Sequence, residues 1–372
     1  MTPVKAMINL KAFQNNINII KKIFPNNKII LPVKANAYGH GSLIISKEAI
    51  RLGIEYLAVA RVDEGIFLRE NGIKKNIIDL GIEFDSDIKL AIKNNIELSV
   101  SSFTNLKEIG DIAKSMNKKI PIHLKVDTGM TRLGIISDSV IKAVEYIEES
   151  KNLYFKSFYT HFAKSDSNLE YTNYQLKQFL SLKQELEKKN LFPEFYHTHN
   201  SGAIMRQIEI ENNFFIRPGI MSYGYPPYID DNINNNNKND NKFDLIPVMT
   251  LQSKVINIKK VKKGTGISYN HKYITEKDTF VATIALGYGD GIQRNLTNKL
   301  IVKINGVSYK QVGTIAMDLM MIEVDESVSI GDIVYIFGNK EYAYYDAFDL
   351  ANLSNTISYE ITTNIADRVD RI

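Results

Sequence analysis

The alternation of short apolar runs with helix-like stretches over the first two thirds of the chain constrains its fold most strongly. Eight runs read as strands: Ile29–Lys34, Tyr56–Ala60, Asn76–Leu80, Ile96–Val100, Ile120–Val126, Phe155–Thr160, Phe195–His199 and Phe214–Arg217. Helical patterns between them include Ser42–Leu52, Asp63–Glu70, Asn105–Met116, Asp138–Glu149 and Leu169–Lys189. Eight strand–helix units within roughly 220 residues predict an α/β fold of the TIM (β/α)8 barrel type, which usually takes about 250 residues.

The last third of the chain predicts a different kind of domain. An asparagine-rich tract at 230–242 has almost no apolar content to offset the entropy of ordering, so we expect a mobile loop there. Beyond it come six apolar runs separated by glycine-containing turns: Val248–Ile258, Thr279–Leu286, Leu300–Ile304, Val307–Thr314, Met320–Val324 and Ile333–Phe337. We therefore predict a barrel domain over residues 1–238 and a mostly-β domain over residues 239–372.

Composition excludes several classes of function. A net charge of +4 on 372 residues, with no basic block, argues against a nucleic-acid partner. The absence of cysteine excludes disulfides, thiolate zinc sites and a cysteine nucleophile, and we predict no metal. No apolar run reaches about 18 residues, and the first ten residues do not resemble a signal peptide. We expect a soluble, cytoplasmic protein without a membrane partner.

A TIM barrel carries its functional side chains just after the strand ends. Lys34 ends the first predicted strand, and a lysine at the mouth of an apolar strand is partly desolvated. Desolvation lowers its pKa, which makes Lys34 a candidate Schiff-base nucleophile. The alternative is a surface lysine that opens a loop. The small, glycine-containing run at 35–41 is expected neither to continue the strand nor to pack in the core.

The other strand ends offer charged, hydroxyl and small residues. They include Lys125, Asp127 and Arg132 after the fifth strand, His161 after the sixth, Ser201 and Gly202 after the seventh, and Gly219 and Ile220 after the eighth. The loops after strands seven and eight are the usual phosphate site of such barrels. A hydroxyl, small residues and free backbone N–H groups at this place favour a phosphorylated cofactor.

The run from Lys34 to Gly41 resembles the pyridoxal-phosphate lysine motif of alanine racemases, which are fold-type III enzymes. Four further segments resemble signatures of the same family and follow its order: GTGISYN (264–270), ALGYGDG (285–291), GTIAMDLMMIEV (313–324) and TISYEI (356–361). The resemblance covers nearly the whole chain. It implies pyridoxal 5'-phosphate as cofactor and interconversion of L-alanine and D-alanine, which supplies D-alanine for peptidoglycan.

The resemblance also implies roles for individual residues. Lys34 matches the lysine that holds the cofactor and acts as one base, and Tyr269 matches the second base. Cofactor contacts correspond to Tyr38, His161, Ser201, Arg217, Gly219, Ile220 and Tyr359. Substrate contacts correspond to Arg132, Met317 and Tyr288. In the family the C-terminal groups other than Tyr359 reach the barrel of the other subunit, which implies a homodimer with shared active sites.

The resemblance also implies specific roles for Lys125 and Arg217. Lys125 corresponds to a lysine that is carbamylated in many family members, where it orients the arginine that matches Arg132. The alternative is that Lys125 is an ordinary lysine paired with Asp127. Arg217 corresponds to the arginine that faces the ring nitrogen of the cofactor. Because a guanidinium does not give up its proton, it keeps the pyridine neutral and suppresses transamination.

The sequence leaves two alternatives to alanine racemisation open. One is a broad-specificity or serine racemase on the same scaffold, because one chain does not reveal the width of the pocket. The other is a non-catalytic pyridoxal-phosphate-binding protein, against which the retained Arg132, Tyr269 and Met317 argue. Two departures from the family pattern are Asn270, where glycine is common, and Ala316, where cysteine is frequent. Asparagine tolerates a positive φ, so we expect the turn after Tyr269 to survive.

Overall fold

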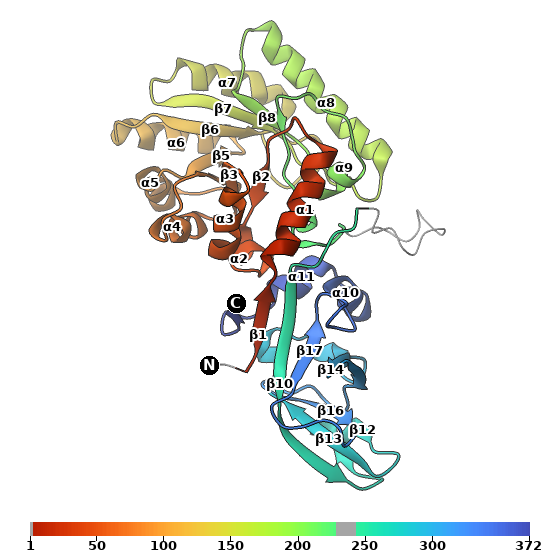
Figure 1. The fold of residues 1–372 in the computed structure, drawn as a ribbon. Helices are drawn as coiled ribbons and strands as arrows, with labels where there is room; N and C mark the ends of the chain where they lie inside the picture. Colours follow the sequence, from red (N-terminus) through yellow and green to blue (C-terminus); the bar gives the residue numbers. More distant parts are fainter. Residues whose placement is uncertain (1–2, 228–242) are drawn as a thin grey trace.

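The computed structural model describes residues 3–227 and 243–372 and contains a barrel followed by a second sheet domain (Figure 1). Eight parallel strands of the described chain form the barrel in sequence order. They are β2 (Ile30–Pro32), β3 (Tyr56–Val59), β4 (Asn76–Asp79), β5 (Glu97–Val100), β6 (Ile120–Lys125), β7 (Leu153–Tyr159), β8 (Phe195–His197) and β9 (Phe214–Phe215). The barrel closes because the N–H of Ile30 donates to the carbonyl of Ile216 at 2.9 Å. The predicted TIM barrel is confirmed.

Helices surround the barrel strands. They are α2 (Lys34–Tyr38), α3 (Ser42–Arg51), α4 (Val62–Glu70), α5 (Asp85–Lys93), α6 (Phe103–Ser115), η1 (Ser137–Ser139), α7 (Val140–Glu149), α8 (Leu169–Lys188), α9 (Ser201–Met205) and η2 (Ile220–Tyr223). The five helical patterns named from the sequence each overlap one of these elements. Their buried residues recur every three or four positions, as in α7, where Val140, Ala143, Val144 and Ile147 face the core.

Helix α1 (Leu10–Ile23) covers the side of the barrel where β9 is followed only by the short helix η2. The ring centroids of Phe13 on α1 and Tyr223 on η2 lie 6.3 Å apart. The buried amide of Asn16 donates to the carbonyl of Ile246 at 2.9 Å and accepts from its N–H at 2.9 Å. It also donates to the carbonyl of Ser222 at 3.3 Å. Asn16 thus joins η2 to the segment that enters the second domain.

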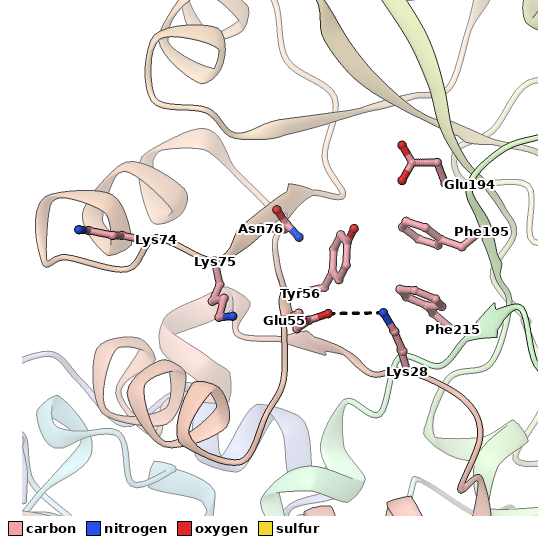
Figure 2. A pocket seen from close by; sticks show the side chains of 9 residues that line it. All are labelled: Lys28, Glu55, Tyr56, Lys74, Lys75, Asn76, Glu194, Phe195 and Phe215. Atoms are coloured by element: carbon pink, nitrogen blue, oxygen red, sulfur yellow. Dashed lines mark ion pairs between the residues drawn. The ribbon is translucent and has the colours of Figure 1, made fainter.

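The interior of the barrel is divided along its axis. Its N-terminal half is filled by an apolar cluster of Ile30, Tyr56, Ala58, Ile78, Phe195 and Phe215. Figure 2 shows Tyr56, Phe195 and Phe215 in the pocket at this mouth, beside the ion pair of Lys28 and Glu55. Polar residues such as Lys125, Tyr159 and Arg217 stand at or just beyond the C-terminal ends of the strands. The apolar half supports the fold, and the polar half is where chemistry is expected.

The second domain contains a sheet of eight strands, as predicted for its mostly-β character. They are β1 (Lys5–Ile8), β10 (Met249–Val261), β13 (Thr279–Ile284), β14 (Ile301–Ile304), β15 (Val307–Lys310), β16 (Met320–Val324), β17 (Ile333–Phe337) and β18 (Asp370–Arg371). Strands β11 (Gly266–Ile267) and β12 (Tyr273–Ile274) form a separate pair. The long strand β10 pairs with β1 and β17 near its start and with β13 toward its end.

The two ends of the chain meet in this second sheet. Strand β1 pairs with β10 and β18, so the first residues of the chain belong to the C-terminal sheet (Figure 1). The tract at 230–242 and the predicted boundary between residues 238 and 239 lie outside the described residues. Helix α10 (Ala347–Ser354) is followed by α11 (Ser358–Thr363), which the sequence analysis did not name.

Helix α11 brings the C-terminal domain against the barrel. A Cβ atom on Gly39 would lie 1.9 Å from the carbonyl oxygen of Thr362, so only glycine permits this approach. The guanidinium of Arg371 donates to the carbonyl of Gly39 at 3.0 Å. The loop that follows Lys34 is therefore held from both domains of the same chain.

In the described part of the chain, no helix is long and apolar enough to cross a membrane. Within the same residues, no group of three or more histidine, aspartate or glutamate side chains is arranged to hold a metal ion.

We predict that Asn16→Ala lowers the free energy of unfolding by about 2–4 kcal/mol, because the buried carbonyl of Ser222 and the part-buried backbone groups of Ile246 lose their partner. Neighbouring Asn15, which makes one exposed hydrogen bond to Asp244, is the matched control. Asn15→Ala should change the same quantity by less than about 0.5 kcal/mol. Urea unfolding of the three proteins measures both values, and equal losses for the two variants would contradict the role given to Asn16.

Candidate active site

Cationic side chains from different strands converge at the C-terminal rim of the barrel. Lys34 follows β2, Lys125 ends β6 and Arg217 follows β9. Arg132, in the loop after β6, acts electrostatically on both lysines. Parallel strands place their C-terminal ends on one rim, which is why residues so far apart in sequence meet here.

Lys34 is half-buried at this rim. Its pKa is lowered, first by burial and then by the charges of Arg132 and Arg217, while Glu64 acts in the opposite direction. A lower pKa increases the fraction of neutral amine, which is the nucleophilic form. The sequence expectation of a desolvated strand-end lysine agrees with this environment.

The turn after Lys34 has an uncommon backbone conformation. Residues 35–38 all have φ between 50° and 54°, in the left-handed region. The carboxylate of Glu64 accepts from the N–H of Ala35 at 2.5 Å and from that of Ala60 at 2.8 Å. The side chain of Asn36 accepts from the N–H of Ser42 at 2.7 Å. These contacts compensate for the strain of a left-handed turn made without glycine.

The expectation that the run at 35–41 does not pack in the core was wrong. Ala37, Tyr38 and His40 are buried, and the ring of Tyr38 stacks on Tyr223 with centroids 4.8 Å apart. Burial lowers the pKa of His40 to about 4. The left-handed turn folds these side chains inward, and no local sequence rule anticipates four consecutive left-handed residues.

Hydroxyl groups and a glycine form a small cradle at the rim. The hydroxyl of Ser201 accepts from the N–H of Met221 at 3.3 Å, just after Gly219 and Ile220. A Cβ atom on Gly219 would lie 2.7 Å from the Tyr38 hydroxyl and 3.8 Å from the Ser201 hydroxyl oxygen. The Tyr359 ring, from α11, lies 5.9 Å from that of Tyr38. The structure therefore brings together Tyr38, Ser201, Gly219, Ile220 and Tyr359, as the sequence indicated.

Arg217 is buried and donates hydrogen bonds only to neutral groups. Its guanidinium donates to the carbonyls of Thr160 at 2.6 Å and Thr198 at 3.2 Å. It also donates to Nδ1 of His197 at 2.5 Å and lies 3.4 Å from Nδ1 of His161. Burial lowers the pKa of Arg217 to about 10. Burial, followed by the charge of Arg217, lowers the pKa of His161 well below its ordinary value.

Lys125 is almost fully buried, and its environment differs from that of a lysine in an ion pair. Its pKa is lowered to about 8 by burial and by the charges of Arg132 and Arg217. Within residues 3–227 and 243–372, Lys125 forms no ion pair within 4 Å with Asp127. One carboxylate oxygen of Asp127 instead accepts three backbone N–H groups, from residues 129–131. Arg132 is exposed, with no hydrogen bond or ion pair to another described residue.

The C-terminal candidates gather on a face of the second domain. Tyr269 is 68% exposed, Tyr288 41% and Met317 54%. Backbone hydrogen bonds join their loops: Tyr288 donates to Ala316 at 3.0 Å, and the Thr314 hydroxyl donates to the carbonyl of Tyr269 at 2.8 Å. Asn270 has φ 59°, as its tolerance of this conformation led us to expect.

Within the described residues, the side chains of Tyr269, Tyr288 and Met317 make no hydrogen bond or ring contact with residues of their own barrel rim. Figure 1 shows β12, β13 and β16 far from the barrel, but the loops of Tyr288 and Met317 lie beside the segment that follows α11. The N–H of Ala366 donates to the carbonyl of Asp290 at 3.1 Å, and the guanidinium of Arg368 donates to Asp318 at 2.8 Å. Tyr359, in contrast, reaches the rim of its own barrel. The structure therefore gathers the barrel candidates and Tyr359 in one place and the remaining C-terminal candidates in another.

Sequence reasoning missed three residues beside the rim. Glu64 holds the turn after Lys34, Tyr159 stacks on His197 with centroids 4.3 Å apart, and His197 accepts from Arg217. The signal for His197 and Tyr159 was their position near the end of a strand, next to residues that were named. Glu64 lies in a helix, where nothing local distinguishes it from a surface carboxylate.

Asp79, at the end of β4, is a fully buried carboxyl near this rim. One of its oxygens accepts from the N–H of Gly81 at 2.9 Å, and the other has no partner among the described residues. Burial raises the pKa of Asp79, and the carboxylates of Glu83 and Glu64 raise it further. Asp79 therefore keeps a proton at pH values where an exposed aspartate is ionised.

Comparisons with known proteins place this chain in a family. Residues 8–227 match the model "Alanine racemase, N-terminal domain", and residues 248–372 match "Alanine racemase, C-terminal domain". The alanine racemase of Treponema denticola is 40% identical over 382 residues, covering 100% of this chain and 98% of that protein. That of Clostridium novyi is 38% identical over 379 residues, covering 100% and 95%.

Solved structures give the same result. The alanine racemase of Clostridium difficile 630 superposes with a TM-score of 0.91 at 35% identity, covering 99% of this chain and 95% of that chain. The Bacillus anthracis alanine racemase with bound L-Ala-P gives 0.89 at 34% identity, covering 99% and 94%. The histidine racemase of Leuconostoc mesenteroides subsp. sake gives 0.90 at 27% identity, covering 100% and 98%.

The raised pKa of Asp79 predicts a stability difference that depends on pH. Between about pH 4, where an unfolded aspartate titrates, and the higher pKa in the folded protein, the folded state binds more protons. Its stability therefore falls as the pH rises, by up to about 1.4 kcal/mol per pH unit. Asp79→Asn removes this loss, so its free energy of unfolding should increase relative to wild type from pH 5 to pH 7. A difference that stays constant in urea unfolding over this range would contradict the prediction.

Proposed function

The chain belongs to the alanine racemase family, and we propose that it interconverts L-alanine and D-alanine with bound pyridoxal 5'-phosphate. The observation that carries the proposal is the pairing of Lys34, whose pKa is lowered, with a hydroxyl-lined cradle on the same rim. The family consists of isomerases, and the D-alanine formed would serve peptidoglycan synthesis. The L-Ala-P bound to the Bacillus anthracis enzyme supports an amino-acid-like substrate.

The residues at the rim fit the proposed cofactor. Tyr38, Ser201, Gly219, Ile220 and Tyr359 would hold its phosphate, because hydroxyls, backbone N–H groups and a missing Cβ meet there. Lys34 would hold its aldehyde carbon through the neutral amine, and His161 would lie beside its ring. When bound, pyridoxal phosphate withdraws electrons and so acidifies the α-hydrogen of an amino acid.

We assign Arg217 to the ring nitrogen of the cofactor. A guanidinium is a donor without an acceptor, and burial lowers its pKa only to about 10. At neutral pH it therefore keeps its proton and offers a hydrogen bond without protonating the ring nitrogen. A weaker electron sink favours return of the proton to the α-carbon over transamination.

Racemisation requires a proton carrier on each face of the substrate. Lys34 would remove and return the proton on one face, helped by its lowered pKa. Tyr269 of the partner subunit would act on the other face. The 68% exposure of Tyr269, whose side chain makes no hydrogen bond with a described residue of its own chain, supports a homodimer in which the C-terminal domain completes the site of the second copy.

The substrate carboxylate would be held by Arg132 and by the backbone N–H of the partner subunit's Met317, with Tyr288 of the partner subunit at the entrance. Arg132 is exposed and has no partner among the described residues. The N–H of Met317 likewise finds no acceptor within the described chain. A pKa of about 8 leaves part of Lys125 as the neutral amine that reacts with carbon dioxide, which supports its carbamylation beside Arg132.

The remaining assignments follow from the same proposal. The barrel, residues 1–238, and the β-domain, residues 239–372, would be the two units, with β1 supplied to the second sheet by the chain's first residues. The enzyme would act in the cytoplasm. A second candidate is a racemase of another or broader amino-acid specificity, which the likeness to a histidine racemase keeps open.

The proposed function predicts that the purified protein with pyridoxal phosphate converts L-alanine to D-alanine faster than it converts serine or histidine. Lys34→Ala should reduce this rate at least roughly 100-fold, because it removes a proton carrier and the cofactor's attachment. Lys28→Ala, at the opposite mouth of the barrel, is the control and should retain activity. Chiral chromatography of the products measures both effects.

Two results would contradict the proposal. A Lys34→Ala variant that keeps wild-type activity would remove Lys34 from the mechanism. Faster turnover of serine or histidine than of alanine would replace the substrate and favour the second candidate.

A further inference from the structure

A chain of four hydrogen bonds runs through the barrel interior from its C-terminal rim toward its N-terminal half. Five consecutive strands contribute one residue each: Arg217 after β9, His197 in β8, Ser157 in β7, His123 in β6 and Glu97 in β5. The distances are 2.5 Å from Arg217 to His197 Nδ1, 2.9 Å from His197 Nε2 to Ser157, 2.6 Å from Ser157 to His123 Nδ1, and 2.7 Å from His123 Nε2 to Glu97.

The two ends of this chain fix its direction. The guanidinium of Arg217 can only donate, so Nδ1 of His197 accepts and its single proton lies on Nε2. Burial and the charge of Arg217 lower the pKa of His197 well below its ordinary value, which keeps the ring neutral. At the other end the carboxylate of Glu97 can only accept, so His123 donates to it from Nε2.

Ser157 connects the two halves. Its oxygen accepts the Nε2–H of His197, and its hydroxyl hydrogen is then free to donate to Nδ1 of His123. All four bonds therefore point from Arg217 toward Glu97. A sequence of hydrogen bonds with one direction and a charge at each end is cooperatively strengthened in a low-dielectric interior.

The interior along this chain is closed to water. His123, Ser157 and His197 are each 0% exposed, and the side chain of Glu97 is 12% exposed. The ring of Phe195 lies 5.8 Å from His197 and 6.1 Å from His123. Phe195 in turn stacks on Phe215 at 4.1 Å, and both rings line the pocket at the N-terminal mouth (Figure 2).

Arg217 needs such a connection because it is a buried cation without an acidic neighbour. None of the ion pairs formed by described residues includes Arg217. Its direct partners are two carbonyls and two histidine rings. Glu97 is the only anionic group that its hydrogen-bond chain reaches within the described residues.

We propose that Glu97, His123 and Ser157 are positioning residues for Arg217, which act by polarising His197 as the acceptor that holds the guanidinium in place. The hydrogen-bond coupling is independent of what the rim binds. Its consequence for catalysis rests on the proposed function, in which Arg217 faces the ring nitrogen of the cofactor.

NMR of the protein labelled with ¹⁵N-histidine tests the coupling through the chemical shifts of the ring nitrogens. The protein has six histidines. In the wild-type protein, His197 and His123 should each carry one proton, on Nε2. Glu97→Gln removes the charge and should shift the ring signals of His197, which is three hydrogen bonds away. In a Ser157→Ala background, Glu97→Gln should no longer shift them, because the connection is cut.

A matched control separates the hydrogen-bond chain from a charge effect through space. Glu194 lines the same mouth and pairs with Lys156 at 2.5 Å, outside the chain. Glu194→Gln should leave the His197 signals unchanged. If Ser157→Ala does not fold, Ser157→Cys, whose thiol is a weak donor, takes its place.

Catalysis supplies the second readout. Ser157→Ala should lower kcat for alanine racemisation roughly 10-fold and leave KM nearly unchanged, because Arg132 is untouched. Ser157→Thr, which keeps the hydroxyl, should restore kcat. Recovery of kcat in Ser157→Thr would show that the hydroxyl positions Arg217. Unfolding measurements on the same variants report any loss of stability separately.

The outcomes separate the inference from the proposed function. The coupling is overturned if His197 carries its proton on Nδ1, if His123 is doubly protonated, or if Glu97→Gln shifts His197 equally without Ser157. The positioning role is overturned if the NMR coupling is present but kcat does not change in Ser157→Ala. If the wild-type protein does not racemise alanine, the proposed function fails, and the NMR experiment still decides the coupling.

Discussion

Mutual repulsion among cations at the C-terminal rim of the barrel sets the chemistry of the site. Lys34, Lys125, Arg132 and Arg217 act on one another there, and none of them forms an ion pair with a described residue. The carboxylate of Glu64 is nearby, but backbone N–H groups occupy it. Burial, and then this repulsion, lowers the pKa values of Lys34 and Lys125, and the excess positive charge favours anionic ligands. A phosphate and an amino-acid carboxylate would each neutralise part of this positive charge.

The backbone beside Lys34 shows how much of the structure is needed to hold one lysine. A left-handed conformation costs about 1–2 kcal/mol per residue, and residues 35–38 all adopt it. The barrel compensates through Glu64 and Asn36, and the C-terminal domain through the contact of Gly39 with Thr362 and Arg371. The second domain therefore has two tasks in the proposed enzyme. It supports the lysine loop of its own chain, and it presents Tyr269 to a second copy.

The barrel was predictable because each strand is a short apolar run and the number of runs matches the fold. The candidate residues at strand ends followed from that topology, since parallel strands share one rim. The left-handed turn and the inward packing of Tyr38 and His40 were not predictable, because they depend on contacts from Glu64 and α11. The hydrogen-bond chain was also hidden: a register shift between Ile122 and His123 aligns His123 with Ser157, and local sequence does not encode such a shift. The roles of Tyr269 and Met317 came from family resemblance alone.

If each active site combines Lys34 of one chain with Tyr269 of the partner subunit, dimers that contain one defective copy of each kind will regain activity. Lys34→Ala and Tyr269→Phe, each nearly inactive, are unfolded together in equal amounts and refolded, so that about half of the dimers are mixed. A mixed dimer then holds one doubly defective site and one intact site. Shared active sites predict recovery of roughly a quarter of wild-type activity. No recovery, from variants shown to be folded and to have exchanged subunits, would contradict this arrangement.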